Sequence, residues 1–224
     1  MAIGLRVSSA RADTDPDLIV RAARLPVANI GDVMNRLQAL RGGFRAFGGR
    51  RGVVGPALTV KARPGDNLFL HRAIDIARPG DVIVCDGGGD LGIALSGDLM
   101  IGLAASRGVA ALVIDGAVRD VATITGMEIG VWARGATPAG PFKDGPGEIG
   151  YPIACGGQVV MTDDLIAADE DGVVVIPRAE AAAVIAAAER HAEGEAATTA
   201  AIAAGTSKRD WVIEALRAKG VANL

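Results

Sequence analysis

Residues 81–120, DVIVCDGGGDLGIALSGDLMIGLAASRGVAALVIDGAVRD, decide the fold of this 224-residue chain. The stretch is typical of an apolar strand, a glycine-rich turn, a helix and a second apolar strand. Strands that are apolar on both sides belong to parallel sheets covered on both faces, so the pattern predicts an α/β unit. Two short charged clusters, residues 97–100 (GDLM) and Arg119-Asp120, fall where such a unit presents its functional edge.

The composition is that of one folded domain. Hydrophobic residues make up 50% of the chain but aromatic residues only 3%, so the core consists mainly of small aliphatic side chains. The 31 glycines are about twice as frequent as the usual ~7%, and they gather at turns without a fixed period. A net charge of −3 gives no electrostatic reason to expect nucleic acid, which normally requires a basic face.

The sequence predicts a cytoplasmic protein without a membrane partner. Cys85 and Cys155 form neither a CxxC motif nor a cysteine–histidine metal spacing, so we expect two reduced thiols. The first residues contain no continuous apolar segment of the kind found in signal peptides. The longest apolar stretch, residues 91–114, is interrupted by Asp98 and Arg107, so it does not predict a membrane span.

The remaining elements follow from periodicity and from helix start and stop signals. Asp15 and Pro16 predict the start of a helical region that reaches residue 40. The expected helices are 16–28, 29–40, 67–77 and 94–107, and the expected strands are 53–62, 81–85, 110–114, 129–133, 157–161 and 172–176. The tail from residue 179 is predicted helical with a break near Gly194. Its apolar face is expected to pack on a neighbouring subunit, with an ordinary cover helix of the same subunit as the alternative.

One glycine pattern also fits a dinucleotide site. Gly87, Gly89 and Gly92 follow the predicted strand in GxGxxG spacing, and Asp115 ends the next strand, where a ribose-binding acid would lie. The helix that this motif should open carries Asp98 in its first turns, which is unfavourable beside a pyrophosphate. In a chain so rich in glycine the match is weak.

Two other chemistries lack suitable residues. His71 and His191 are the only histidines, and neither lies near a serine or cysteine with nucleophile context. The four lysines lie in polar or terminal surroundings, Lys61 least clearly so, and not where burial would lower a lysine pKa enough for Schiff-base chemistry. If this protein makes or breaks a carbon–carbon bond, the sequence favours a metal over an imine.

The stronger candidate site combines the two charged clusters. The free N–H groups at the start of a helix attract anions, and Arg119 could grip a carboxylate through two hydrogen bonds. Asp120 offers an oxygen ligand of the kind that Mg²⁺ or Mn²⁺ prefers, and Asp98 could move a proton to or from a bound water. Taken singly, Asp98 could be a helix-start charge, and Arg119 with Asp120 a surface ion pair worth ~0–1 kcal/mol.

Two segments of the sequence, one of which contains both charged clusters, resemble a known family. Residues 87–120, together with 136–177 (ATPAGPFKDGPGEIGYPIACGGQVVMTDDLIAADEDGVVVIP), are similar to the RraA-like family, which includes the 4-hydroxy-4-methyl-2-oxoglutarate aldolases. The resemblance extends over about residues 25–205. It implies a single α/β domain of the swivelling β/β/α type over residues 1–224, with helical N- and C-terminal segments. It also implies homotrimers or homohexamers with active sites at subunit interfaces.

The resemblance implies a pyruvate aldolase that depends on a divalent metal, Mg or Mn, and that also decarboxylates oxaloacetate. By motif, Gly97, Asp98, Leu99 and Met100 would offer backbone amides to the pyruvoyl group of a 2-oxo acid. Arg119 would bind substrate oxygens, Asp120 would anchor the metal, and Asp98 would hold the water that protonates the enolate. Asp32 and Glu195 match the family's acids that reach in from a neighbouring subunit.

Two alternatives remain within the same resemblance. The family includes proteins that bind and inhibit a ribonuclease, but a pure regulator has no need of Asp32, Asp98, Arg119 and Asp120 together. Another small 2-oxo-acid lyase, or a hydratase, could use the same metal site. Members often carry the label demethylmenaquinone methyltransferase, yet nothing in this chain resembles a methyl-donor site.

Overall fold

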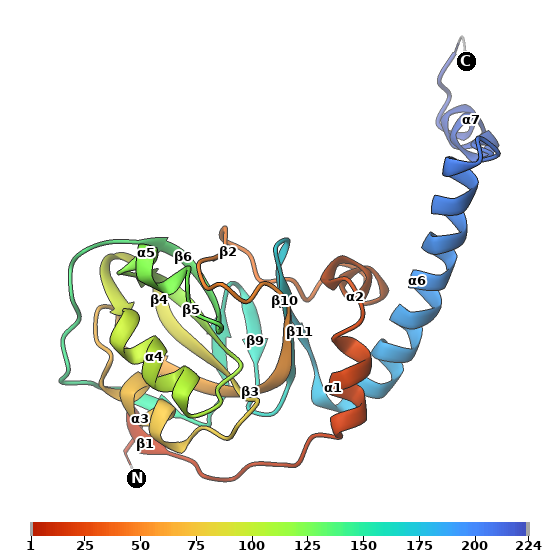
Figure 1. The fold of residues 1–224 in the computed structure, drawn as a ribbon. Coiled ribbons are helices and arrows are strands. Elements are labelled where there is room, and N and C mark those ends of the chain that lie inside the picture. The colour runs from red at the N-terminus through yellow and green to blue at the C-terminus, as the bar shows by residue number, and fades with distance from the viewer. Residues whose placement is uncertain (1, 223–224) are drawn as a thin grey trace. The chain divides into compact units, whose positions relative to one another are not determined.

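The computed structural model describes residues 2–222, which form a mixed α/β fold with helices near both ends of the chain (Figure 1). This confirms the predicted fold class. The chain divides into two compact units, Met1–Ala188 and Glu189–Leu224. Among the described residues, no helix combines the length and the apolar character needed to cross a membrane.

The first unit is built around a sheet with the strand order β1-β7-β3-β4-β5-β6-β2. Its four inner strands, β3 to β6, run parallel to one another, as expected for strands that are buried on both faces. The strands of this path are β1 (Leu5–Val7), β2 (Arg45–Ala46), β3 (Val53–Ala62), β4 (Val82–Ser96), β5 (Ala111–Val118), β6 (Gly130–Ala136) and β7 (Gly147–Ile149).

A second group of strands leaves this sheet at β3. The first residues of β3 pair with β10 (Leu165–Asp169) in an antiparallel register, and its later residues pair with β4. β10 continues into an antiparallel pair with β11 (Gly172–Ile176). β8 (Ile153–Cys155) and β9 (Gln158–Val160) form a separate hairpin. β3 therefore belongs to both groups of strands and joins them.

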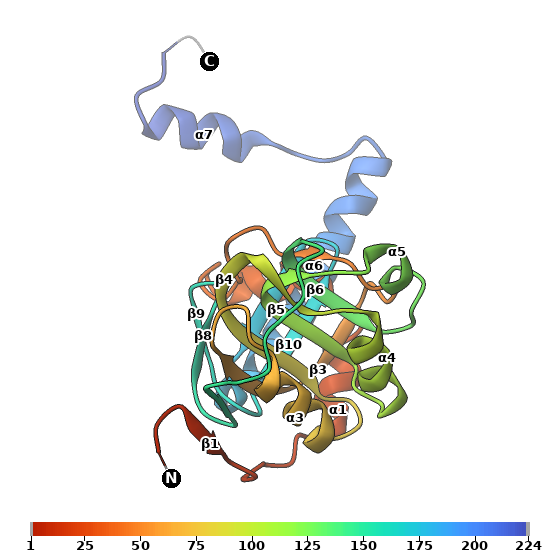
Figure 2. The same ribbon diagram turned by 90° about the vertical axis from the view of Figure 1, so that its left-hand side faces the viewer.

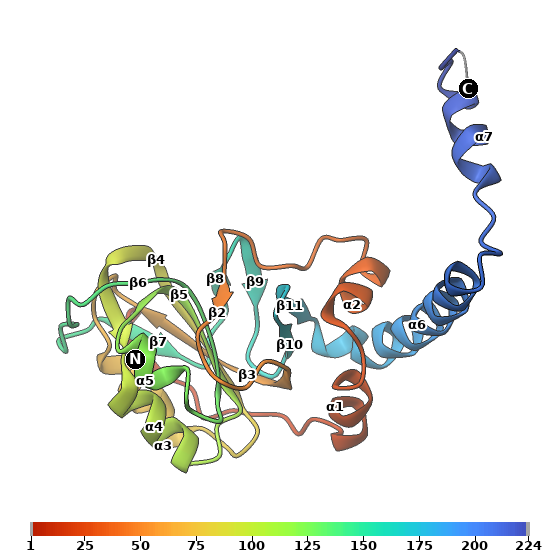
Figure 3. The same ribbon diagram turned by 45° about the horizontal axis from the view of Figure 1, so that its top comes forward.

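Helices and strands of the first unit form layers around three apolar cores. The helices α3 (Leu68–Ile76), α4 (Asp98–Ser106) and α5 (Val121–Ile124) cover one face of the parallel strands (Figure 2). Strands β8 to β11 supply the apolar residues that pack on the other face, around the buried Trp132. The helices α1 (Pro16–Ala22) and α2 (Val27–Val33) pack with the start of α6 on β10 and β11 (Figure 3).

The segment before α1 is anchored to this unit by a buried ion-pair cluster. The Arg11 guanidinium donates to both carboxylate oxygens of Asp81 at 2.8 and 2.9 Å and to Asp163 at 2.6 Å. The three side chains are only 6%, 1% and 7% exposed. The cluster fastens the N-terminal segment to the start of β4 and to the turn before β10.

Several predicted elements agree with the structure, and one central prediction is wrong. The strands at 53–62 and 172–176 have the predicted bounds, and Asp15 caps α1, with Pro16 as its first residue. The expected turn after residue 85 does not end the strand, because β4 runs on to Ser96. The helix predicted over 94–107 therefore begins only at Asp98.

Two further helix predictions have wrong boundaries. The helix expected over 29–40 is α2, which ends at Val33, because Asn35 and Arg36 adopt left-handed backbone angles. The predicted break near Gly194 is absent. Helix α6 (Ala181–Ala203) passes through Gly194 without interruption, since alanine-rich neighbours offset the low helix propensity of one glycine. The break falls instead between α6 and α7 (Asp210–Ala218).

Candidate functional site

The two charged clusters meet because β4 and β5 are parallel neighbours. Ser96, the last residue of β4, pairs with Val118, the last residue of β5. The chain that follows each strand therefore leaves the sheet at the same edge, and the Arg119 amide donates to the Ser96 carbonyl at 3.0 Å. This register places Gly97-Asp98 beside Arg119-Asp120, as the sequence predicted.

The Asp120 carboxylate accepts a hydrogen bond from the Asp98 amide and forms an ion pair with Arg119. Its Oδ2 lies 3.3 Å from Arg119 Nε and 3.3 Å from the backbone nitrogen of Asp98. Asp120 holds a left-handed backbone conformation, φ 60° and ψ 36°, just before α5. Its side chain is 36% exposed, and its Oδ1 has no partner among residues 2–222. One carboxylate oxygen is therefore open to a ligand.

The start of α4 is only partly free to bind an anion. The amide of Leu99 donates to the Asp98 side chain at 2.7 Å, and that of Asp98 donates to Asp120. The first bond within the helix runs from the Ile101 amide to the Gly97 carbonyl at 3.1 Å. A substrate carboxylate at this helix start would compete with two side-chain carboxylates.

A pocket of about 170 Å³ opens beside these residues. It is lined by Asn67, His71, Ser96, Gly97, Asp98, Leu99, Met100, Arg119, Pro141 and Lys143. Arg119 also lines an adjoining hollow with Asp120. The predicted set Gly97 to Met100 and Arg119 therefore shares one pocket, with Asp120 at its border.

Sequence reasoning missed four polar residues of this pocket: Asn67, His71, Ser96 and Lys143. Lys143 lies in the Gly/Pro-rich segment after β6, which the sequence shows only as a turn region. His71 lies on α3, where helical spacing alone makes it one polar residue of a surface helix. Asn67 gave no signal either, because an asparagine at a helix start is normally expected to cap the helix with its side chain. Only the structure shows that it does not.

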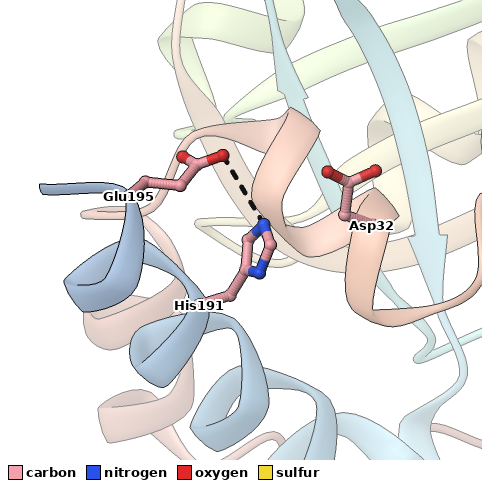
Figure 4. Close-up of side chains that lie close together, drawn as sticks. All are labelled: Asp32, His191 and Glu195. Carbon is pink, nitrogen blue, oxygen red and sulfur yellow. Dashed lines mark ion pairs between the residues drawn. The ribbon is translucent and has the colours of Figure 1, made fainter. Parts of the chain in front are cut away.

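Two predicted site residues do not reach this pocket. Asp32, on α2, forms an ion pair with Arg36 at 2.8 Å and lines a different hollow of the first unit, of about 380 Å³. Glu195 belongs to the second unit, where it lies 3.5 Å from the imidazole of His191, one turn earlier on α6 (Figure 4).

The dinucleotide motif has no phosphate-binding structure around it. Gly87, Gly89 and Gly92 all lie inside β4 and open no helix. Asp115, expected to contact a ribose, is buried, forms an ion pair with Arg134 and accepts the Gly156 amide at 2.7 Å. Asp115 therefore connects β5 to Arg134 on β6 and to the turn that follows β8.

Burial and charge also lower the pKa of His71. Burial of the imidazole and the neighbouring Lys143 ammonium keep this pKa below its ordinary value of 6.5, against the opposing effect of Asp75. We expect an NMR titration to place the His71 midpoint below 6.5 and Lys143→Met to raise it. The His71 pKa is lower in the folded protein than in the unfolded chain. The stability contributed by neutral His71 is therefore fully present above the pKa of the unfolded chain and is lost as the pH falls through the pKa of the folded protein. His71→Gln identifies the resonance, and a midpoint above 6.5 would contradict the assignment.

Comparison with known proteins decides the family. A family model for RraA-like proteins, described as Aldolase/RraA, matches residues 27–175. The chain belongs to the RraA-like family. A Halalkalibacterium halodurans relative, provisionally named 4-hydroxy-4-methyl-2-oxoglutarate aldolase, is 40% identical over 164 residues, which cover 73% of this chain and 78% of the relative.

Solved RraA-like structures share the fold. The structure described as the RNA-processing inhibitor RraA from Thermus thermophilus is 33% identical and has a TM-score of 0.63, covering 68% of this chain and 92% of its own. A Streptomyces coelicolor protein, described as an unusual member of the RNase ES inhibitor RraA family, is 26% identical with a TM-score of 0.76. That match covers 83% of this chain and 97% of the other. The names of these RraA-like relatives therefore include both an aldolase and ribonuclease inhibitors.

Proposed function

We propose that this RraA-like protein is a divalent-metal-dependent pyruvate aldolase. It would cleave 4-hydroxy-4-methyl-2-oxoglutarate, or a related 4-hydroxy-2-oxo acid, to pyruvate and a second oxo acid, and would decarboxylate oxaloacetate as a side activity. The observation that carries the proposal is the meeting of Asp98, Arg119 and Asp120 at the edge of one pocket. A cation, an open carboxylate oxygen and a second carboxylate are the groups that this chemistry requires.

The residues at the edge of the pocket fit a hard divalent cation. Mg²⁺ and Mn²⁺ sites commonly use one or two carboxylates and leave the other positions to waters and substrate oxygens. Asp120 would hold the cation, since its Oδ1 is open while Arg119 and Asp98 orient the other oxygen. The cation would act as a Lewis acid on the keto oxygen of the substrate.

The side chains of the pocket supply the rest of the chemistry. The Arg119 guanidinium would bind the pyruvoyl oxygens and stabilise the negative charge that develops on the C2 oxygen as the C3–C4 bond breaks. The Asp98 carboxylate would hold a water that accepts the C4 hydroxyl proton as the C3–C4 bond breaks and then returns a proton to C3 of the pyruvate half. Lys143, which also lines the pocket, would attract the second carboxylate of a dicarboxylic substrate.

The most direct test measures pyruvate release from oxaloacetate and from 4-hydroxy-4-methyl-2-oxoglutarate. We expect no turnover after treatment with EDTA and recovery on addition of Mg²⁺ or Mn²⁺. Equal rates with and without metal would overturn the metal-dependent mechanism. Absence of both activities with metal present would overturn the aldolase proposal.

Gly97 has to remain a glycine for this site to form. A Cβ at this position would overlap Asp120 Oδ2 and approach the Arg119 side chain to 3.0 Å. We expect Gly97→Ala to lower kcat/KM for oxaloacetate about a hundredfold, because small displacements of reacting groups cost about that much. Gly102→Ala is the matched control on α4, since its Cβ would meet nothing closer than 4.0 Å. Equal activities of the two variants would contradict this account.

We further propose that a second copy of the chain completes the site, in a homotrimer or homohexamer. Asp32 lies in a hollow of the first unit that is separate from the Arg119 pocket, which supports a role in a neighbour's site. Glu195 is proposed to act in the same way. We expect inactive Asp32→Asn and Asp120→Asn proteins to regain activity when refolded together, up to about one quarter of the wild-type rate for random pairing. Absence of recovery in a mixed oligomer, verified by mass, would contradict shared sites.

The second candidate function is regulation of a ribonuclease. The solved relatives described as inhibitors of RNA processing favour it. Inhibition of RNA cleavage by the metal-free protein, together with inactivity on both oxo acids, would select this function. Another lyase or a hydratase acting on small 2-oxo acids would share the metal requirement and differ in its products. The two buried free cysteines support a cytoplasmic location for either function.

A further inference from the structure

Two buried side chains of the Arg119 pocket present polar atoms that the protein leaves unpaired. Asn67 and Ser96 are each only 2% exposed, and both line the pocket. Among residues 2–222, neither Asn67 Oδ1 nor Ser96 Oγ has a hydrogen-bond partner. Buried polar groups are almost always paired, and leaving one unpaired costs about 1–3 kcal/mol. Two such atoms in one pocket therefore point to a ligand group.

The orientation of the Asn67 amide is fixed by its neighbours. Asn67 Nδ2 lies 3.0 Å from the Leu95 carbonyl oxygen and 2.9 Å from the sulfur of Met100. Both of these atoms only accept hydrogen bonds, so the amide nitrogen has to face them. The carbonyl oxygen Oδ1 is therefore the atom of the Asn67 amide without a partner among residues 2–222, and it can only accept a hydrogen bond.

The position of Asn67 supports a role outside helix capping. Asn67 immediately precedes α3, but the capping bond to the Leu68 amide comes from the Asp66 side chain at 3.0 Å. The Asn67 backbone is held by a bond from its amide to the Phe142 carbonyl at 3.0 Å. The side chain is thus rigidly placed without serving the helix.

The pair has the hydrogen-bonding pattern that complements a hydroxyl group. Asn67 Oδ1 can accept a proton, and Ser96 Oγ can both donate and accept. A carboxylate or a ketone has only acceptors, so it would be repelled by Asn67 Oδ1. An ammonium group could donate to both atoms, but the Arg119 and Lys143 cations line the same pocket and disfavour a positive ligand.

We infer that Asn67 and Ser96 form a subsite for the hydroxyl of the bound oxo acid, which makes Ser96 a specificity-determining residue. The hydroxyl would donate to Asn67 Oδ1 and accept from Ser96 Oγ. The basic side chains that line the pocket, Arg119 and Lys143, would bind the carboxylates. This inference rests on the proposed function for the nature of the ligand. It adds which side chains recognise the hydroxyl, because a ligand without that group leaves both Asn67 Oδ1 and Ser96 Oγ unpaired.

The test removes the Ser96 hydroxyl and the ligand hydroxyl separately and together, with Mg²⁺ present throughout. Wild type and Ser96→Ala are compared in kcat/KM for 4-hydroxy-2-oxoglutarate and in the inhibition constant of 2-oxoglutarate, which lacks the hydroxyl. We expect Ser96→Ala to lower kcat/KM for 4-hydroxy-2-oxoglutarate about tenfold and to change the inhibition constant of 2-oxoglutarate less than about twofold. Ser106→Ala, on the exposed end of α4, is the matched control and should change neither.

Stability separates recognition from a structural role. Since Ser96 Oγ has no protein partner, Ser96→Ala should leave the free energy of unfolding of the ligand-free protein unchanged or raise it. A loss of stability, or equal effects on the two ligands, would overturn the inference. If the wild-type protein turns over neither oxo acid, the proposed function fails. Calorimetric dissociation constants of the same two ligands then decide the hydroxyl subsite on its own.

Discussion

Replacing Asp120 by asparagine is expected to lower the metal-dependent kcat/KM for oxaloacetate about a thousandfold. Asparagine keeps the shape of the side chain and an oxygen that can accept from Arg119 and from the Asp98 amide. It removes the negative charge that would hold the cation, and Lewis-acid stabilisation by a bound metal is worth several kcal/mol. Pyruvate release at increasing Mg²⁺ or Mn²⁺ concentration measures the effect.

The Asp120→Asn substitution should have little effect on the stability of the fold. Asp120 is 36% exposed, and ion pairs so open to solvent contribute only ~0–1 kcal/mol. Asp90→Asn is the control, since Asp90 is a partly exposed carboxylate of β4 that bonds only to the nearby Gly92 amide and lines no part of the pocket. Wild-type metal dependence in the Asp120→Asn protein would exclude Asp120 as the metal ligand.

The Arg11→Met substitution is expected to have the largest effect on stability, a loss of about 3–5 kcal/mol. It leaves the carboxylates of Asp81 and Asp163 buried without the guanidinium that bonds to both. Each carboxylate keeps one or more backbone N–H donors, from Arg78 and Ala12 respectively, but no charge of opposite sign. Urea denaturation followed by circular dichroism measures the change.

Two further variants test whether unpaired charge is the cause. Arg72→Met removes an exposed arginine whose nearest carboxylate is 3.9 Å away, and we expect a change below about 0.5 kcal/mol. The triple variant Arg11→Met, Asp81→Asn, Asp163→Asn should recover part of the lost stability because it removes the buried charges as well. A triple variant less stable than Arg11→Met alone would show that packing, not charge, governs this cluster.

The sequence was sufficient for the parallel core but not for its irregularities. Long apolar runs predicted β3 and the start of β4, because burial on both faces leaves a continuous hydrophobic signal. The same signal failed after Asp86, where glycines and aspartates read as a turn although the strand continues to Ser96. Strands β1, β2, β7, β8 and β10 were not predicted. The first four have only two or three residues, which is too few to show a periodicity.

The candidate site could be predicted only where chain order and strand order coincide. Asp98 and Arg119 follow two neighbouring parallel strands, so the predicted strand order brings them to one edge, although the first strand ends at Ser96 and not at residue 85 as predicted. His71 and Lys143 reach the pocket from a helix and a turn segment that are distant in sequence, and no local pattern connects them. The roles of Asp32 and Glu195 remain predictions, as they depend on how copies of the chain assemble.

The irregular part of β4 has a consequence for how the length of this chain can vary. Between the pairs Asp86–Asp115 and Ser96–Val118, the register of β4 against β5 shifts three times. β5 has a single irregularity, in its pairing with β6 between Ile114 and Ala117. The surplus residues of β4 bulge out of the ladder, and the pairing on either side fixes both ends independently. An insertion or deletion within these bulges would be absorbed locally, whereas one at residues 111–118 would turn every following side chain to the opposite face. Related sequences should therefore differ in length on the β4 side and keep a constant spacing along β5 up to Arg119.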